Sequence, residues 1–62
     1  MNEFDQKILK YLESRKTAAT IKQVAKFFIR SESAVSKSLN SLAERGMVKC
    51  IKAAGTKFYS IV

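Results

Sequence analysis

The residues best suited to chemistry lie on one side of a helix that we predict over residues 31–45. Their side chains are short, form hydrogen bonds and include a single cation; they are Ser33, Ser36, Lys37, Asn40 and Ser41. Donors and acceptors of this kind suit a helix that lies close to base edges in a nucleic-acid groove. A solvated helix surface more commonly carries Glu–Lys pairs, and here the acids Glu32 and Glu44 stand only at the ends. A serine-rich surface helix without a ligand would have the same composition, so both interpretations stay open.

The opposite side of this helix is apolar. Val35, Leu39 and Leu42 recur at i, i+4 and i+7, which predicts a stripe buried in the core. Ser31 is a suitable N-cap, because its hydroxyl can accept a hydrogen bond from a first-turn N–H. Gly46 follows the last turn, where glycine can adopt the left-handed conformation that ends a helix.

A first helix is predicted over residues 2–14, with Asn2 as its cap. Its apolar stripe comprises Phe4, Ile8, Leu9, Tyr11 and Leu12. We expect Phe4, Ile8 and Leu12 in the core. Residues 14–19 are predicted to form a loop, in which residues 17–19 could lie extended and pair with a later strand.

A second helix begins at Thr20, which stands at capping-box spacing from Gln23. Its predicted stripe comprises Ile21, Val24, Ala25 and Phe28. The run Phe27–Ile29 cannot fit one stripe. Either the helix ends here and Ile29 turns inward, which we favour, or part of the run is an exposed contact surface. Only two or three residues, with no glycine, separate this helix from Ser31, which predicts a steep angle between the two helices.

The pattern alternates after Gly46. Residues 47–52 and 57–62 are rich in strand formers, and the loop between them carries Gly55, which predicts a β-hairpin. Tyr59 and Ile61 are expected to face the helices, and Phe58 and Ser60 the other side. Cys50 is expected to be a small, half-buried strand residue, with a redox-sensing thiol as the alternative.

The charge favours a polyanionic partner. The 62 residues, expected to form a single domain, carry twelve Lys and Arg against five Asp and Glu, a net +7. After residue 33 the chain carries five basic residues and a single acid, Glu44; the basic residues are Lys37, Arg45, Lys49, Lys52 and Lys57. The basic residues of the first helix and of the residues that follow it are expected to serve solubility; they are Lys7, Lys10, Arg15 and Lys16.

Catalysis is not expected. The chain has no histidine, its one cysteine cannot form an internal disulfide, and its carboxylates are scattered. No nucleophile–base pair, metal-ligand set or cofactor motif is visible, so no cofactor is expected. No apolar run approaches the ~20 residues that span a bilayer, and no secretory signal begins the chain. We therefore expect a cytoplasmic protein without membrane attachment.

The order helix, strand, helix, helix, strand, strand resembles the winged helix-turn-helix DNA-binding domain. Residues 20–48 are similar to the second helix, turn and recognition helix of MarR-like bacterial regulators, with SLAERGMVK at 41–49 leading into the wing. DQKILKYLES at 5–14 and GTKFYSI at 55–61 resemble the first helix and the closing wing strand. The small size is also similar to that of FaeA-like regulators. The resemblance implies an α+β fold and double-stranded DNA as partner.

The resemblance also implies roles for individual residues. Base edges would be contacted from the recognition helix by Ser33, Ser36, Lys37 and Asn40. The phosphate backbone would be contacted by the helix starts and the wing, through Thr20, Lys22, Gln23, Ser31, Lys52, Thr56 and Lys57. Many such regulators place an Arg near position 37 or 38 to read guanine, and this helix has none on that face. That departure indicates modest specificity or dependence on a protein co-regulator. A homodimer is a separate expectation, because one module offers few base contacts and palindromic half-sites suit two-fold symmetry.

Other uses of this fold remain as alternatives. A winged helix that binds Z-form nucleic acid carries a Tyr on its third helix and a Pro-Pro-Trp wing, whereas this chain contains no proline. A protein-interaction module without DNA binding would use an exposed Phe27, Ile29 or Phe58. A membrane-surface role would need an amphipathic helix to spare, and the stripe of the first helix is needed for the core.

Overall fold

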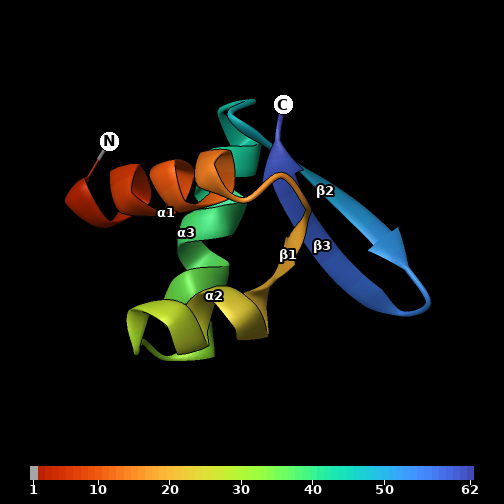
Figure 1. Ribbon diagram of the computed structural model, residues 1–62, viewed down its shortest axis with the longest axis horizontal. Coiled ribbons are helices and arrows are strands. Elements are labelled where there is room, and N and C mark those ends of the chain that lie inside the picture. The colour runs from red at the N-terminus through yellow and green to blue at the C-terminus, as the bar shows by residue number, and fades with distance from the viewer. Residues whose placement is uncertain (1) are drawn as a thin grey trace.

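The computed structural model, which describes residues 2–62, contains three helices and three strands (Figure 1). One short strand lies between the first two helices, and the other two follow the third helix. The elements in chain order are α1 (Glu3–Ser14), β1 (Ala19–Thr20), α2 (Ile21–Phe28), α3 (Glu32–Glu44), β2 (Val48–Ala53) and β3 (Thr56–Ile61). In Figure 1, α1 and α2 lie in front of α3, and the β2–β3 hairpin extends away from the helices. This is the expected α+β winged-helix arrangement.

Local capping explains where the helices begin. The Asn2 side chain accepts from the Asp5 N–H at 2.8 Å, and the Ser31 hydroxyl accepts from the Ala34 N–H at 3.2 Å. At the start of α2, Thr20 and Gln23 exchange two backbone–side-chain bonds of 3.1 Å each. These bonds confirm all three predicted caps. Each cap stabilises its helix because it satisfies an N–H group that has no partner within the helix.

The core is formed by the predicted stripes together with one wall of the sheet. Its buried apolar residues are Ile8, Leu12, Ala19, Val24, Ala25, Val35, Leu39, Leu42, Val48 and Tyr59. Phe4, expected in the core, is half-buried and packs against it. Tyr59 lies between Ala19 on β1 and Cys50 on β2 in the sheet register, so the strand order is β1-β3-β2.

Ile29 does not turn inward, contrary to our prediction. It ends α2 in the left-handed region, with φ 54° and ψ 53°, and 90% of its surface is exposed. The Arg30 N–H donates to the Ala25 carbonyl at 2.9 Å, which satisfies a terminal carbonyl of the helix as in a Schellman motif. The geometry of the turn therefore points the Ile29 side chain outward. The hydrogen bond from Arg30 to Ala25 is kept, although the Ile29 side chain then stays exposed to solvent.

Two strand predictions also need correction. Cys50 is exposed rather than half-buried, because the hairpin extends beyond the helices and only Val48 on β2 is buried. Phe58 is half-buried rather than exposed, because β3 is the central strand and Phe58 lies between Thr20 and Ile51. The short extended piece predicted over residues 17–19 is β1 at Ala19–Thr20, which shares only Ala19 with the prediction.

The hairpin turn has two residues. Ala53 pairs with Thr56, and both Ala54 and Gly55 have positive φ, at 50° and 76°. Positive φ at both central positions is the type I′ turn, whose twist matches that of the paired strands. The predicted hairpin is confirmed, and the turn is tighter than the four-residue loop that the sequence indicated.

Candidate functional site

The exposed side of α3 carries most of the predicted base-contacting residues. Ser33, Lys37 and Asn40 are exposed, whereas Ser36 is half-buried on the flank. The buried stripe Val35, Leu39 and Leu42 holds α3 against the core and leaves this side outward. The face is thus rich in short hydrogen-bonding groups, as the sequence indicated.

Asn40 is not free on this face. The Tyr59 hydroxyl, on β3, donates to Oδ1 of Asn40 at 3.3 Å. Burial raises the pKa of Tyr59, and the neighbouring Cys50 raises it further. The phenol therefore keeps its proton at neutral pH and remains a hydrogen-bond donor to Asn40. Sequence analysis placed Tyr59 in the core and gave no sign of this contact.

The start of α2 and the tip of the wing border one hollow of about 350 Å³. Its lining comprises Thr20, Ile21, Lys22, Gly55, Thr56 and Lys57. Four of the seven residues predicted to contact phosphate thus come together from segments more than thirty positions apart. The lining contains two lysines, two hydroxyls and no acid, a combination that suits a phosphate group.

Lys52 and Lys57 lie directly opposite each other near the wing tip. Like charges at opposed positions of an antiparallel pair destabilise it. They share the face of the hairpin that carries Tyr59, and both are exposed. A bound anion would remove this repulsion.

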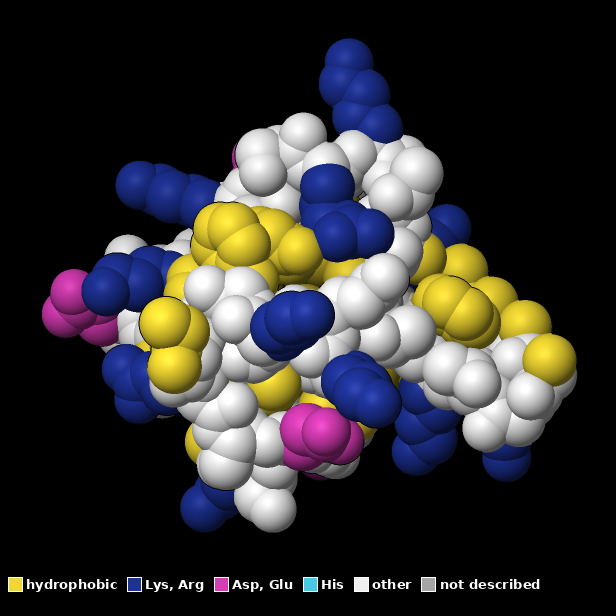
Figure 2. Space-filling model, turned by 60° about the horizontal axis from the view of Figure 1, so that its bottom comes forward, with side chains coloured by type: hydrophobic (Ala, Val, Ile, Leu, Met, Phe, Trp, Pro, Cys, Tyr) yellow, Lys and Arg dark blue, Asp and Glu magenta, His cyan; other side chains and the backbone are white. Residues whose placement is uncertain are grey.

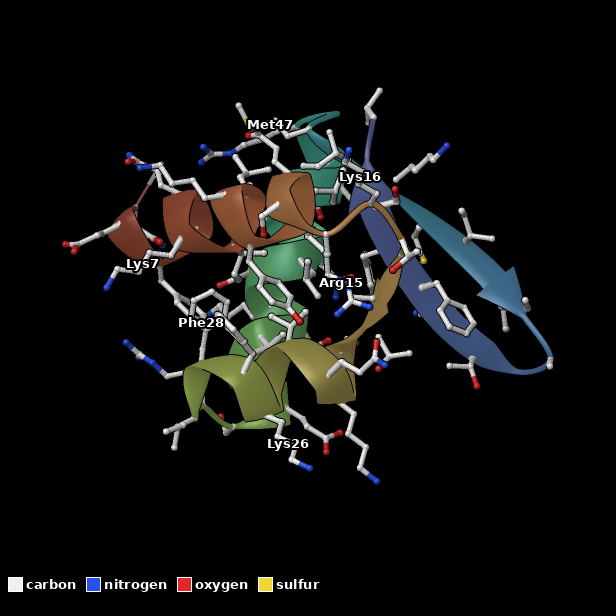
Figure 3. All side chains as sticks on the ribbon, in the orientation of Figure 1. Lys7, Arg15, Lys16, Lys26, Phe28 and Met47 are labelled. Carbon is white, nitrogen blue, oxygen red and sulfur yellow. The ribbon has the colours of Figure 1, made fainter. Side chains whose placement is uncertain are left out.

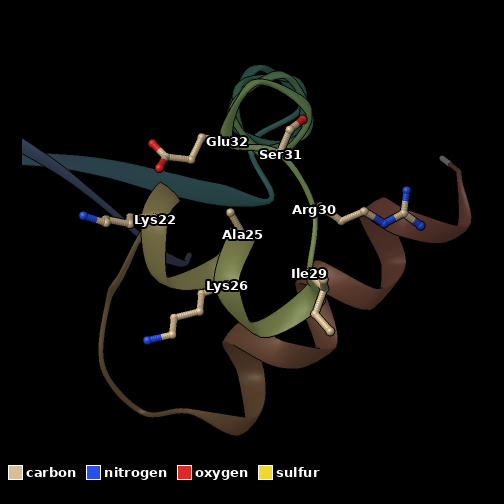
Figure 4. A pocket seen from close by; sticks show the side chains of 7 residues that line it. All are labelled: Lys22, Ala25, Lys26, Ile29, Arg30, Ser31 and Glu32. Carbon is tan, nitrogen blue, oxygen red and sulfur yellow. The ribbon is translucent and has the colours of Figure 1, made fainter.

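A larger hollow, of about 610 Å³, lies where α2 meets the start of α3 (Figure 4). Lys22, Lys26 and Ser31 border it, together with the acid Glu32. The Arg30 side chain turns toward α1 (Figure 4), with its guanidinium carbon 4.7 Å from the Phe4 ring centroid. Glu32 would repel a phosphate here, so the hollow at the wing tip is the better anion site despite its smaller volume.

Lys26 is a residue that the sequence analysis did not include in the site. It stands four positions after Lys22, so both lie on one side of α2 and border the same hollow. That i, i+4 spacing was the available signal. Arg15, expected to serve solubility, also donates from Nη1 to the Tyr11 hydroxyl at 2.8 Å.

The side chains at the helix caps already use part of their hydrogen-bonding capacity. The hydroxyls of Thr20 and Ser31 each accept from a backbone N–H, which leaves their own O–H available to donate. The Gln23 carbonyl accepts from the Thr20 N–H, so its amide NH₂ is the free end. All three residues can therefore donate to an anion without breaking a cap.

Two further properties bear on the kind of site. Among residues 2–62, no three His, Cys, Asp or Glu side chains gather as they would around a metal ion. None of the described helices combines the length and apolar character needed to cross a bilayer.

Comparison with known proteins identifies the architecture. A family model described as winged helix-turn-helix DNA-binding matches residues 1–49, which include the three helices and the start of β2. No curated protein matches the chain.

Proposed function

The chain belongs to the winged helix-turn-helix DNA-binding family, and we propose that it is a small transcriptional regulator that inserts α3 into the major groove of double-stranded DNA. The observation that carries this proposal is the position of Lys22. It borders one hollow with the start of α3 and another with the wing tip, so it lies between the two elements that would contact DNA.

The base contacts are assigned to α3. Ser33, Lys37 and Asn40 are exposed on one side of the helix, and half-buried Ser36 flanks them. Serine donates to or accepts from any base edge, and lysine favours guanine, so these residues discriminate weakly. We therefore expect modest sequence specificity, with Asn40 as the main source of discrimination.

The phosphate contacts are assigned to the helix starts and the wing. Lys22 and Lys57 flank the acid-free hollow, and Thr20 and Thr56 supply hydroxyls there. Lys52 extends this positive region along the hairpin, while Gln23 and Ser31 contribute donors from the caps. Lys26 borders only the hollow that also carries Glu32, so it is given no phosphate contact. Several such contacts make affinity fall steeply with salt, by about 0.9 log units per phosphate for each tenfold rise.

Fluorescence anisotropy with a labelled mixed-sequence duplex tests the proposal. We expect binding in the range of roughly 1–100 μM that weakens steeply as salt rises. Replacing Lys37 and Asn40 with Ala should weaken binding and leave the circular dichroism spectrum unchanged. Replacing Lys16 with Ala, on the loop after α1, is the matched control. An absence of binding at low salt would overturn the proposal, and equal affinity of the double variant would remove α3 from the interface.

The regulator is proposed to act in the cytoplasm without catalysis or a cofactor. One module of this size makes few base contacts, so a homodimer on a two-fold half-site arrangement, or a protein co-regulator, would supply the remaining specificity. Light scattering with and without a duplex separates these options, because a dimer on DNA doubles the bound protein mass.

A further inference from the structure

An aromatic cluster joins α1 and α2. The rings of Tyr11 and Phe27 have centroids 4.2 Å apart, and those of Phe27 and Phe28 have centroids 4.9 Å apart. Phe28 reaches inward to Phe4, at 5.6 Å. The cluster is only partly covered, because 60% of the Phe27 surface is exposed while Tyr11 and Phe28 are half-buried.

A groove of about 310 Å³ runs beside this cluster. We call it the α1–α2 groove; it is lined by Lys7, Lys10, Tyr11, Ser14, Phe27 and Phe28. None of the residues that we propose to contact DNA lines it. Its aromatic floor suits an apolar side chain, since anchors of that type fill desolvated pockets at protein interfaces.

The border of the groove is basic. Lys7 and Lys10 line it, and the Arg15 guanidinium carbon lies 5.5 Å from the Tyr11 ring centroid. The acid beside it is Glu3, whose carboxylate is 3.7 Å from the Lys7 ammonium on an exposed surface. In Figure 2, hydrophobic side chains form a patch above the centre of the face, with Lys and Arg side chains beside it, and further hydrophobic side chains lie at the left and right.

We propose that the α1–α2 groove binds an acidic, amphipathic helical segment of another protein, which inserts an apolar side chain against Phe27. Acidic residues flanking that side chain would face Lys7, Lys10 and Arg15, and such complementarity sets partner choice. A second copy of this chain fits poorly, because it would bring an identical basic border against the first. A nucleic-acid strand would also meet a basic border and an aromatic surface, so the test includes competition with an oligonucleotide.

The groove and the DNA-contacting face can be occupied together. In Figure 1, α1 and α2 lie in front of α3, and Figure 3 shows Lys7 and Phe28 on the side that α1 and α2 share. Neither Lys37 nor Asn40 lines the groove, so an apolar side chain inserted there would leave both free to contact DNA. The inference therefore does not depend on the proposed function, and its test uses the protein without DNA.

Titration of the ¹⁵N-labelled chain with designed peptides, followed by NMR, tests this inference. The probe is a helical peptide of about 14 residues, roughly four turns, with Leu and Phe at i, i+3, i+4 and i+7 and Glu elsewhere. One control peptide replaces every Glu with Lys, and a second replaces every apolar residue with Gln. We expect the acidic apolar peptide alone to shift the amides of residues 7–14 and 26–29.

Two variants with matched controls assign the contact. Phe27→Gln should weaken binding of the acidic apolar peptide about tenfold, as expected for loss of an aromatic anchor. Val62→Gln, which also replaces an exposed apolar residue, should have little effect. Lys10→Glu should weaken binding several-fold, whereas Lys16→Glu makes the same charge change outside the groove and should not.

Several results would overturn the inference. Shifts confined to α3 and the hairpin would mean that the peptide only mimics a polyanion on the DNA face, and equal binding of the Gln control peptide would mean that charge alone suffices. No shift at about 1 mM peptide, the weak end of measurable affinity, would also reject it. Displacement of the peptide from residues 7–14 by single-stranded oligothymidine would assign the groove to nucleic acid. Concentration-dependent shifts without peptide would assign it to a second copy.

Discussion

The hydroxyl of Tyr59, on the central strand of the sheet, donates a hydrogen bond of 3.3 Å to Oδ1 of Asn40 on α3. The bond joins the buried wall of the wing to the exposed side of the helix, because Tyr59 is 1% exposed while Asn40 is exposed. It also orients the amide of Asn40. With Oδ1 directed to Tyr59, the NH₂ group is the end available to a base, and it matches acceptors such as N7 and O6 of guanine.

Tyr59→Phe should change which base Asn40 prefers. The substitution removes the donor and little volume, so the fold should persist with a loss of about 1 kcal/mol. The amide could then turn and pair with adenine through both its oxygen and its nitrogen. Selection from a randomised duplex pool measures the preference, with Tyr11→Phe as a control that removes a hydroxyl bonded to Arg15 rather than to Asn40. An identical selected sequence would show that Tyr59 does not orient Asn40.

The same hydroxyl should make stability fall at alkaline pH. Burial and then Cys50 raise the pKa of Tyr59 in the folded protein above the 10.0 of an unperturbed tyrosine. Above pH 10.0 the unfolded chain therefore loses this proton while the folded chain retains it, so the free energy of unfolding decreases as pH rises. The contribution is complete below pH 10.0 and is lost as pH rises through the folded pKa.

Urea unfolding between about pH 8 and about pH 11 measures this effect. Every other ionisable group is common to the wild type and Tyr59→Phe, so the difference between the two curves isolates the phenol. The variant should show a shallower decrease. Parallel curves for the two proteins would contradict the assignment.

The fold could be predicted from sequence because its elements are set by local signals. Helical stripes, caps at Ser31 and Thr20, and Gly55 in the turn each act within a few residues. Ile29 could not be placed in this way, because its direction depends on the bond that ends α2, from the Arg30 N–H to Ala25. The same holds for the candidate site. The exposed positions on α3 could be predicted from helical periodicity, whereas the Tyr59–Asn40 contact depends on tertiary packing and could not.

Lys52→Gln and Lys57→Gln should each reduce the salt dependence of DNA binding. A lysine that neutralises one phosphate contributes about 0.9 to the slope of log affinity against log salt, so the double variant should lose about 1.8. Removing the opposed like charges should also stabilise the free protein, by on the order of a few tenths of a kcal/mol. Anisotropy titrations at several salt concentrations measure the slope, with Lys16→Gln as control. A slope unchanged in the double variant would place the wing away from the backbone.

Ile29→Gly should stabilise the protein. The left-handed conformation at φ 54° brings a Cβ close to the neighbouring carbonyl, which costs about 1–2 kcal/mol for residues other than glycine. Because 90% of Ile29 is exposed, the substitution forfeits little burial. Glycine also gives the unfolded chain more freedom, which offsets part of the gain and leaves about 1 kcal/mol, or roughly 4–8 °C in Tm.

Thermal unfolding followed by circular dichroism tests this expectation, with Ala34→Gly as the matched control. Ala34 lies in the first turn of α3 with ordinary helical geometry, so glycine there should destabilise by about 1 kcal/mol. Opposite signs for the two substitutions would show that the left-handed turn, rather than glycine itself, determines the result. A lower Tm for Ile29→Gly would mean that the isoleucine contributes contacts larger than the strain, and the turn after α2 would then need a different account.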